Sequence, residues 1–253
     1  MIYSENFKIK FHDTDVNRIA RASAVLMYMQ EVANRQFETL GPSLDKLRDE
    51  RQLAFILSRI TIRMYKPLRA YDEIESQTWT CESHGVNFER CFRMLCKGNV
   101  VAEGVSSWAL LNINNRHFVR VEDFSKECGF TPEPMLSLDT PIRFHIPAST
   151  NMNLAGERLI TYSDLDCNAH MNNTKYPDML CDFLPDMRGR RVSGITLSFL
   201  GESAWGDTLK IYVCPETSTA SADSENSVFL IRTVNQSGKV CLEARIVLSD
   251  IEQ

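Results

Sequence analysis

The pentapeptide Asp13-Thr14-Asp15-Val16-Asn17 returns 151 positions later as Asp164-Leu165-Asp166-Cys167-Asn168. Each copy has an aromatic residue two positions before it, Phe11 in the first and Tyr162 in the second, and each is followed by an amphipathic segment. A short motif that repeats together with its context is typical of a duplicated structural unit. The chain is therefore predicted to contain the same fold twice.

Helical and strand-like patterns follow each copy in the same order. Apolar residues recur at helical spacing from Ala22 to Leu40, where Gly41-Pro42 ends the helix, and a second amphipathic helix is predicted from Tyr176 to Leu184. Strand-like runs come after the first helix at residues 53–65, 73–81, 88–96 and 100–112, and after the second at 192–200, 208–214, 228–234 and 240–248. One helix followed by strands with short turns predicts an antiparallel sheet packed on a helix in each half.

The likeness of the halves continues beyond the helices. Tyr71-Asp72-Glu73-Ile74 can be laid on Gly206-Asp207-Thr208-Leu209 at the smaller offset of 135, which places the longer connections in the first half. Between the halves the periodicity fades and four prolines accumulate, which is typical of a linker. We therefore expect an N-terminal unit at residues 1–124, a linker at 125–150 and a C-terminal unit at 151–253.

The composition narrows the class of protein. With 253 residues, 43% hydrophobic and 24% charged, the chain is neither collagen-like nor low-complexity nor globally disordered. A net charge of −5 argues against a general binder of nucleic acids or other polyanions. The N-terminus has no signal-peptide pattern and no apolar run is long enough to cross a membrane, so a cytoplasmic protein is expected.

The eight cysteines form no C-x-x-C pair, and reduced, buried thiols are the simplest interpretation. Cys81-x-x-His84 with Cys91 and Cys96 is a candidate zinc site, but the odd separation of Cys91 and Cys96 in an alternating run places them on opposite faces of a strand and disfavours zinc. No metal and no cofactor is implied. The chain also lacks a G-x-S-x-G elbow, a Walker loop and a dinucleotide fingerprint, which disfavours the corresponding hydrolases and dehydrogenases.

The second copy holds chemistry that the first lacks. His170 aligns with Ile19, and Glu202 aligns with Pro67. A histidine near a carboxylate such as Asp166 can be held in one tautomer and titrate near neutral pH.

The neighbouring polar residues suit hydrolysis as well. Asn168 could donate to an oxyanion, and Glu202 could take a proton from water. Ser203 is a conceivable nucleophile only with an adjacent base. The alternative is that the Asp and Asn residues only form turns and caps, with Asn172 or Asn173 as a helix N-cap.

The run from Tyr162 to Tyr176 resembles the S-D-L-D-x-N-x-H-x-N-N-x-K-Y signature of acyl-acyl carrier protein (acyl-ACP) thioesterases, a family of plant plastid enzymes and bacterial relatives. Residues 108–116 resemble the W-x-x-M-[ND]-x-x-T-R strand end of that family, and residues 29–33 resemble its L-Q-E-x-A. The resemblance implies an α+β tandem double hotdog fold, in which each half wraps an antiparallel sheet around a long helix. It also implies hydrolysis of fatty acyl-ACP to free fatty acid and carrier protein in fatty acid biosynthesis, a part of lipid metabolism.

The resemblance carries the family's catalytic residues to Asp166, Asn168 and His170, and its Glu-Cys pair to Glu202-Ser203. Ser203 is a departure, because plant members typically have Cys there. We therefore expect direct attack by water, with Glu202 activating or orienting it, Asn168 and a backbone N–H stabilising the oxyanion, and His170 with Asp166 assisting the thiol leaving group. The roles of His170 and Glu202 could be exchanged.

An acidic carrier protein would need a local basic dock. Arg188, Arg190, Arg191 and Lys175 are candidates, and an ordinary solvated turn is the alternative. By the same resemblance, the first half helps shape the apolar tunnel for the acyl chain. An acyl-CoA thioesterase and a noncatalytic acyl-binding hotdog protein remain alternatives. A chain with two hotdog units can act as a monomer, and a homodimer is not excluded.

Overall fold

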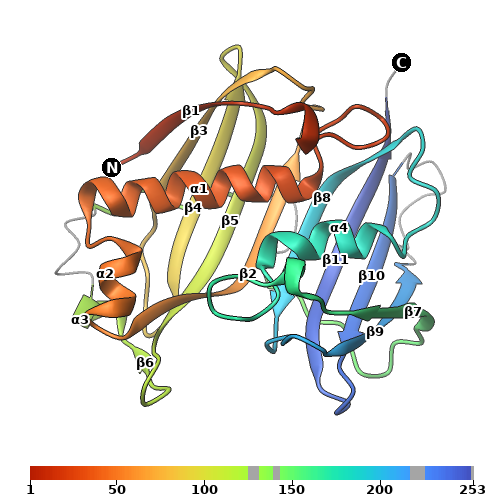
Figure 1. Ribbon diagram of the computed structural model, residues 1–253. Coiled ribbons are helices and arrows are strands. Elements are labelled where there is room, and N and C mark those ends of the chain that lie inside the picture. The colour runs from red at the N-terminus through yellow and green to blue at the C-terminus, as the bar shows by residue number, and fades with distance from the viewer. Residues whose placement is uncertain (125–130, 139–142, 217–225, 252–253) are drawn as a thin grey trace.

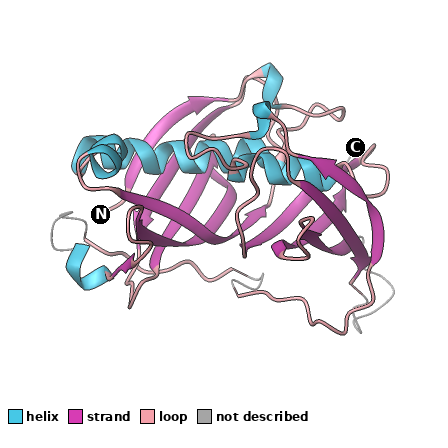
Figure 2. Ribbon diagram, turned by 60° about the horizontal axis from the view of Figure 1, so that its bottom comes forward, coloured by secondary structure: helices cyan, strands magenta, loops and turns pink. Residues whose placement is uncertain are grey.

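The computed structural model describes residues 1–124, 131–138, 143–216 and 226–251. Within these ranges, eleven strands form one antiparallel sheet in the order β1-β3-β4-β5-β2-β8-β11-β10-β9-β7, with β6 added to β5. The last five strands of this order repeat the first five in reverse, with β7 to β11 corresponding to β1 to β5. The two halves therefore meet at β2 and β8 and are related by a pseudo-twofold axis. The helices α1 (Ala22–Leu40) and α4 (Tyr176–Cys181) lie on one face of the sheet, which curves around them (Figures 1 and 2).

The first half contains most of the helical residues. Its elements are β1 (Tyr3–Lys8), a 3-10 turn (Phe11–Asp13), α1 (Ala22–Leu40), α2 (Leu44–Asp49), β2 (Leu53–Met64), β3 (Glu73–Thr80), β4 (Phe88–Cys96), β5 (Asn99–Asn112), β6 (Phe118–Val119) and α3 (Val121–Phe124). The α1 helix crosses the strands of this half (Figure 1). It buries an apolar stripe on them, as the helical spacing of its apolar residues predicts.

The second half repeats this order with a shorter helix. Its elements are β7 (Asn153–Leu159), 3-10 turns at Tyr162–Asp164 and Asn173–Lys175, α4 (Tyr176–Cys181), β8 (Arg190–Phe199), β9 (Thr208–Pro215), β10 (Asn226–Val234) and β11 (Val240–Asp250). The α4 helix covers the strands of this half (Figure 1). The tandem arrangement of two sheet-and-helix units is the double hotdog fold that was expected.

The predicted helix from Ala22 to Leu40 and the strands after both helices are confirmed within a few residues. The expectation of a long helix in both halves is wrong for the second, because α4 is six residues long. Pro177 stands in its first turn, where proline is tolerated, and Pro185 soon follows its end, where the helix could not continue. Asn172, one of the two expected N-caps, accepts the Thr174 N–H at 2.9 Å.

The duplication predicted from the paired motifs is also present in the hydrogen bonds of the backbone. In the first half Asp15 N donates to Ile19 O at 2.9 Å, and in the second Asp166 N donates to His170 O at 2.8 Å. Asp15 Oδ1 and Asp166 Oδ1 each accept the backbone N–H two residues further on, both at 2.8 Å. One residue in each loop, Arg18 or Ala169, has a φ of 61°. The two loops are therefore copies of one backbone structure.

The smaller offset of 135 is confirmed in the same way. Ile9 N donates to Asp72 O at 2.9 Å, and Ile160 N donates to Asp207 O at 2.8 Å. The pairing of Asp72 with Asp207 is the one that aligns Pro67 with Glu202. The comparison of the halves residue by residue therefore holds around the candidate site.

The two halves share one core across the seam between β2 and β8. Arg59 to Arg63 pair with Ser198 to Gly194, and in the middle the hydroxyls of Thr61 and Thr196 lie 3.1 Å apart, both fully buried. Apolar residues of both halves belong to the same buried cluster. The described parts of residues 125–150 contain no helix or strand. The domain limits 1–124, 125–150 and 151–253 stay predictions.

No helix in the described ranges is long and apolar enough to cross a membrane.

Candidate active site

The carboxylate of Asp166 holds the backbone of the loop from Leu165 to Met171 in place. Asp166 Oδ1 accepts the backbone N–H of Asn168 at 2.8 Å and that of His170 at 3.4 Å. A side chain that bonds its own loop in this way is a turn former. Asp166 therefore fixes the backbone that carries Asn168 and His170, as the alternative interpretation of the sequence proposed for it.

A second loop, between β8 and β9, brings Glu202 to this first loop. Met171 N donates to Ser203 O at 2.8 Å, and His170 forms a backbone bridge with Ala204. As a result, His170 Nε2 lies 3.5 Å from Glu202 Oε2, with the two side chains 34% and 45% exposed. The carboxylate at the imidazole is thus that of Glu202. The half-open position lets both groups reach a substrate and a water molecule.

Ser203 points the other way, into the core. The residue is 1% exposed, and its Oγ accepts a hydrogen bond from the Tyr176 hydroxyl at 3.0 Å. Burial raises the pKa of Tyr176 to about 12, so its hydroxyl stays a neutral donor. The geometry places Ser203 among packing contacts, while His170 and Glu202 face each other and Asn168, two residues before His170, is exposed.

The site includes a residue of the first half that the sequence interpretation did not place there. Arg116 Nη2 lies 3.6 Å from Glu202 Oε2, the same oxygen that faces His170. Arg116 is the last residue of the segment that resembles the W-x-x-M-[ND]-x-x-T-R strand end. This resemblance is the signal in the sequence that could have pointed to Arg116. No local pattern indicates that the turn after β5 reaches the other half.

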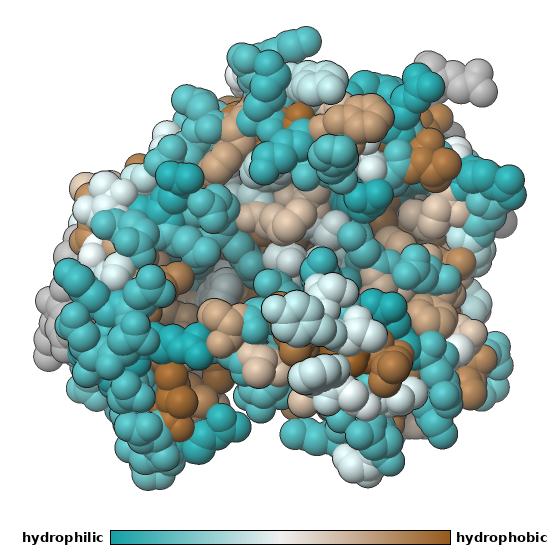
Figure 3. All heavy atoms as spheres, in the orientation of Figure 1, coloured by the Kyte–Doolittle hydropathy of each residue, from teal (hydrophilic) through white to brown (hydrophobic). Residues whose placement is uncertain are grey.

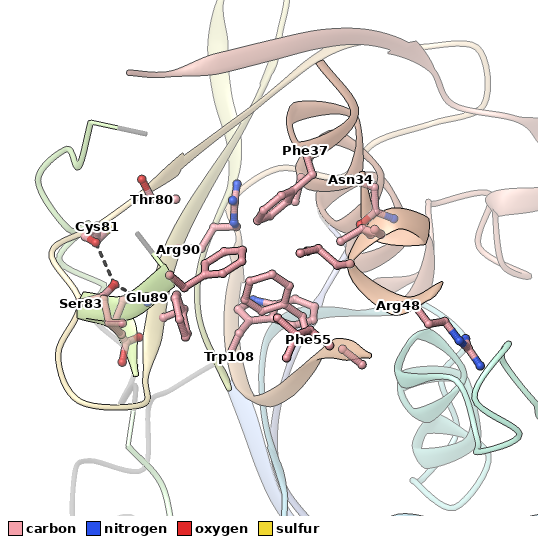
Figure 4. A pocket seen from close by; sticks show the side chains of 18 of the residues that line it. Asn34, Phe37, Arg48, Phe55, Thr80, Cys81, Ser83, Glu89, Arg90 and Trp108 are labelled. Carbon is pink, nitrogen blue, oxygen red and sulfur yellow. Dashed lines mark hydrogen bonds between the residues drawn. The ribbon is translucent and has the colours of Figure 1, made fainter. Parts of the chain in front are cut away.

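An apolar cavity of about 570 Å³ opens beside the first loop. It lies between α1, α2 and the sheet of the first half, and Cys167 and Asn168 of the second half form part of its wall. Figure 4 shows Phe37 and Phe55 reaching into it from α1 and β2, and Trp108 from β5. A cavity of this size and lining is typical of a small-molecule or lipid site.

Two arginines border this cavity in different ways. Arg90 is 5% exposed and donates to Gln36 Oε1 and, at 2.9 Å, to Thr78 Oγ1, while its guanidinium lies over the Phe37 ring. Arg48 turns away from the cavity toward the second half (Figure 4), where its Nη2 donates to Cys167 O at 2.9 Å. Arg48 thereby ties the loop of the second half to the cavity wall of the first.

The second half is closely packed at one point between its helix and its edge strand β7. Phe183, just after α4, packs so closely on β7 that a methyl group added at Gly156 would lie 2.7 Å from its ring. The short helix and this ring leave the second half tightly filled at that point. The large cavity therefore lies in one half and the candidate catalytic side chains in the other.

The three arginines proposed for the dock have partners within the chain. Arg188 is paired with Asp186, Arg190 Nε lies 3.4 Å from Asp250 Oδ1, and Arg191 donates to the Met64 carbonyl at 2.9 Å. The helix-bearing face as a whole is mostly hydrophilic, with apolar side chains showing between the polar ones (Figure 3).

In the part of the chain that the structure covers, no group of three or more His, Cys, Asp or Glu side chains is arranged to hold a metal ion. Cys81 and Cys91, two of the residues weighed as zinc ligands, lie with their sulfurs 3.2 Å apart as buried free thiols. Cys214 and Cys241 are buried too, whereas Cys167 is exposed. Cys128 lies outside the described residues.

Both halves match models of one protein family. Residues 1–127 match the acyl-ACP thioesterase N-terminal domain, and residues 151–249 match the acyl-ACP thioesterase C-terminal domain. The chloroplastic oleoyl-acyl carrier protein thioesterase of Coriandrum sativum is 23% identical over 96% of this chain and 69% of its own length. Oleoyl-acyl carrier protein thioesterase 2 of Arabidopsis thaliana is 25% identical over 85% of this chain, which spans 63% of that protein.

Solved structures have the same fold. An acyl-ACP thioesterase from Bacteroides thetaiotaomicron matches with a TM-score of 0.83 at 20% identity, over 98% of both chains. The 12:0-ACP thioesterase from Umbellularia californica matches with a TM-score of 0.84 at 19% identity, over 99% of this chain and 94% of the other.

Proposed function

The chain belongs to the acyl-ACP thioesterase family, and from this we propose that it hydrolyses fatty acyl-ACP to free fatty acid and carrier protein, as an enzyme of fatty acid biosynthesis. One observation carries the proposal. His170 and Glu202 lie 3.5 Å apart, and Asn168, on the same loop as His170, lines an apolar cavity of about 570 Å³. Hydrolysis of a lipid thioester needs both a slot for the chain and polar groups positioned at the thioester.

The proposed reaction begins with water at Glu202. Glu202 takes a proton from the water as its oxygen attacks the thioester carbon, and the carbonyl oxygen becomes an oxyanion. Asn168, at the wall of the cavity, and a backbone N–H are the proposed donors to that oxyanion. The catalytic roles of Asp166, Asn168, His170 and Glu202 are proposals, with Asp166 acting through the loop that it holds.

The second step breaks the bond between carbon and sulfur. A protonated His170 gives its proton to the departing thiolate, which leaves as the free thiol of the phosphopantetheine arm, and the acyl group leaves as the fatty acid. The proton gained by Glu202 then returns to His170, whose Nε2 is 3.5 Å from Glu202 Oε2. The exchange restores both groups without any cofactor. The opposite assignment of acid and base uses the same contact.

The contacts of Ser203 favour water over the serine as the nucleophile. Its Oγ accepts the Tyr176 hydroxyl, and the residue is 1% exposed. A serine nucleophile needs a base within hydrogen-bond distance and access to the substrate. The candidate bases His170 and Glu202 lie on the open side of the loop.

The proposed partner is an acyl carrier protein with a phosphopantetheine-linked chain, and a cytoplasmic location stays a prediction, since the plant relatives are named as chloroplastic. The decisive experiment compares steady-state hydrolysis of acyl-ACP and acyl-CoA that carry the same acyl chains. We expect a clearly higher kcat/KM for acyl-ACP. A preference for acyl-CoA would make the protein an acyl-CoA thioesterase, and tight acyl binding without hydrolysis would make it a noncatalytic binding protein.

A further inference from the structure

The turn after β5 carries Arg116 from the first half toward the second. Asn112 holds this turn, because its Oδ1 accepts the backbone N–H groups of Asn114 and Asn115 at 3.1 and 3.2 Å and its carbonyl accepts Arg116 N–H at 2.9 Å. Arg116 has a φ of 60°, in the left-handed region that residues other than glycine seldom occupy. Surroundings that hold a residue in such a conformation suggest a function for its position.

The guanidinium of Arg116 meets the carboxylate that the mechanism uses. Its Nη2 lies 3.6 Å from Glu202 Oε2, with the side chains 64% and 45% exposed. An ion pair this exposed contributes little to folding, because both charges remain hydrated and screened. Stability therefore does not account for the contact.

The geometry of the contact indicates that it orients the Glu202 carboxylate. Glutamate has three rotatable side-chain bonds, and half of the Glu202 side chain is open to solvent, so the carboxylate alone could take several orientations. Arg116 and His170 both face Oε2, from opposite halves of the chain. Two partners on one oxygen restrict the carboxylate and leave Oε1 for the water. Fixing a reacting group in this way is worth a large rate factor when the geometry matters.

We propose that Arg116 is a positioning residue for the thioester hydrolysis proposed above, in which the first half orients the Glu202 carboxylate of the second. The inference rests on the proposed function and adds a residue to it. The arginine acts through Glu202 and makes no contact of its own with the reacting atoms. The first half, which lacks counterparts of His170 and Glu202, thus contributes to catalysis as well as to the cavity.

A double-mutant cycle on the full chain tests this. Arg116→Ala is expected to lower kcat about 10-fold with KM within about twofold, because the ground-state contacts of the substrate are unchanged. Arg116→Lys retains the charge and is expected to recover kcat to within about threefold of wild type. In a Glu202→Gln background, Arg116→Ala is expected to change the residual kcat by less than about twofold, since the group it orients no longer acts.

Arg120→Ala is the matched control, because Arg120 is as exposed as Arg116 and pairs with Glu122 away from the site. It is expected to keep the wild-type kcat, and thermal melting checks that every variant folds. The inference is overturned if Arg116→Ala costs the same factor with and without Glu202, or if it raises KM and leaves kcat unchanged. A wild-type protein that hydrolyses neither acyl-ACP nor acyl-CoA would instead refute the proposed function.

Discussion

The first and second halves use one loop for opposite purposes. In the first half the Asn17 side chain donates to the carbonyls of Met187 and Arg190 at 2.7 and 2.8 Å and accepts the Gly189 N–H at 3.0 Å, so it clamps the second half. In the second half Asn168, on the same backbone, is exposed at the cavity of the first.

Two other pairs of aligned positions differ just as much. Ile19 is buried where the second half has the half-exposed His170. Pro67 likewise stands where the second half has Glu202. The comparison teaches that the loop backbone is a structural element in both copies, and that the proposed chemistry depends on two side chains of the second half and on the neighbouring first half. A composite site of this kind needs both halves to work.

The sharpest way to break the asymmetry is to remove the two side chains that the first half lacks. Glu202→Gln, Glu202→Ala and His170→Ala are each expected to lower kcat by about 10²–10⁴-fold, the usual worth of a general acid or base. Steady-state hydrolysis of acyl-ACP measures the effect. His117→Ala and Glu122→Gln, which change exposed residues of the first half, are expected to leave kcat unchanged. Full activity in either His170→Ala or Glu202→Gln would contradict the proposed roles.

The cavity distinguishes the halves in the other direction. Ala54 lines it, so Ala54→Phe is expected to lower kcat/KM for long acyl chains by about 10-fold or more, and to affect short chains much less, because added bulk competes with the end of a long chain. Kinetics over a series of acyl-ACP chain lengths tests this. The matched control is Ala155→Phe, at an exposed position of the second half. An equal loss at every chain length would place the acyl chain elsewhere.

Mutation of the paired aspartates Asp15 and Asp166 can distinguish a structural role of the loop from a catalytic one. Asp15→Ala and Asp166→Ala each remove a carboxylate that accepts backbone N–H groups, so each is expected to cost about 1 kcal/mol of unfolding free energy, by analogy with the loss of a cap. Only Asp166→Ala is expected to lower kcat as well, by about fivefold to tenfold, because its loop carries His170. Urea denaturation and kinetics on the same samples decide it. An equal loss of activity in Asp15→Ala would show that the first loop is also catalytic.

Ser203 gives the smallest expected effect on activity. Ser203→Ala is expected to keep kcat within about threefold of wild type, because water is the proposed nucleophile. It should destabilise the fold by about 1–3 kcal/mol, since the buried Tyr176 hydroxyl loses its acceptor. A loss of kcat as large as that of Glu202→Ala would refute attack by water and restore Ser203 as the nucleophile.

Much of the fold could be predicted because its signals are local and repeated. The helix from Ala22 to Leu40 has a long apolar stripe and a Gly-Pro end, and the central strands are strongly apolar. The edge strands β1 and β7 were not predicted, since neither contains a fully buried residue and their apolar patterns are weak. The length of α4 was overestimated because Phe183 and Leu184 continue the apolar spacing past the end of the helix, although they only pack on the core.

The site was predictable where chemistry differs between two aligned copies, as at His170 and Glu202. Three of its features depend on long-range contacts that no local pattern contains. The partner of the His170 ring is Glu202, 32 residues away, and Arg116 arrives from the other half. The inward turn of Ser203 depends on Tyr176, which lies on another element.

The seam between β2 and β8 also determines what happens when the polypeptide is divided. Cut within residues 125–150, each fragment keeps a complete sheet but exposes a strand edge whose natural partner is the other fragment. The paired threonines and the buried apolar residues around them favour binding of this edge to the other fragment over other partners. We therefore expect that two separately produced pieces recover the proposed thioesterase activity only when they associate.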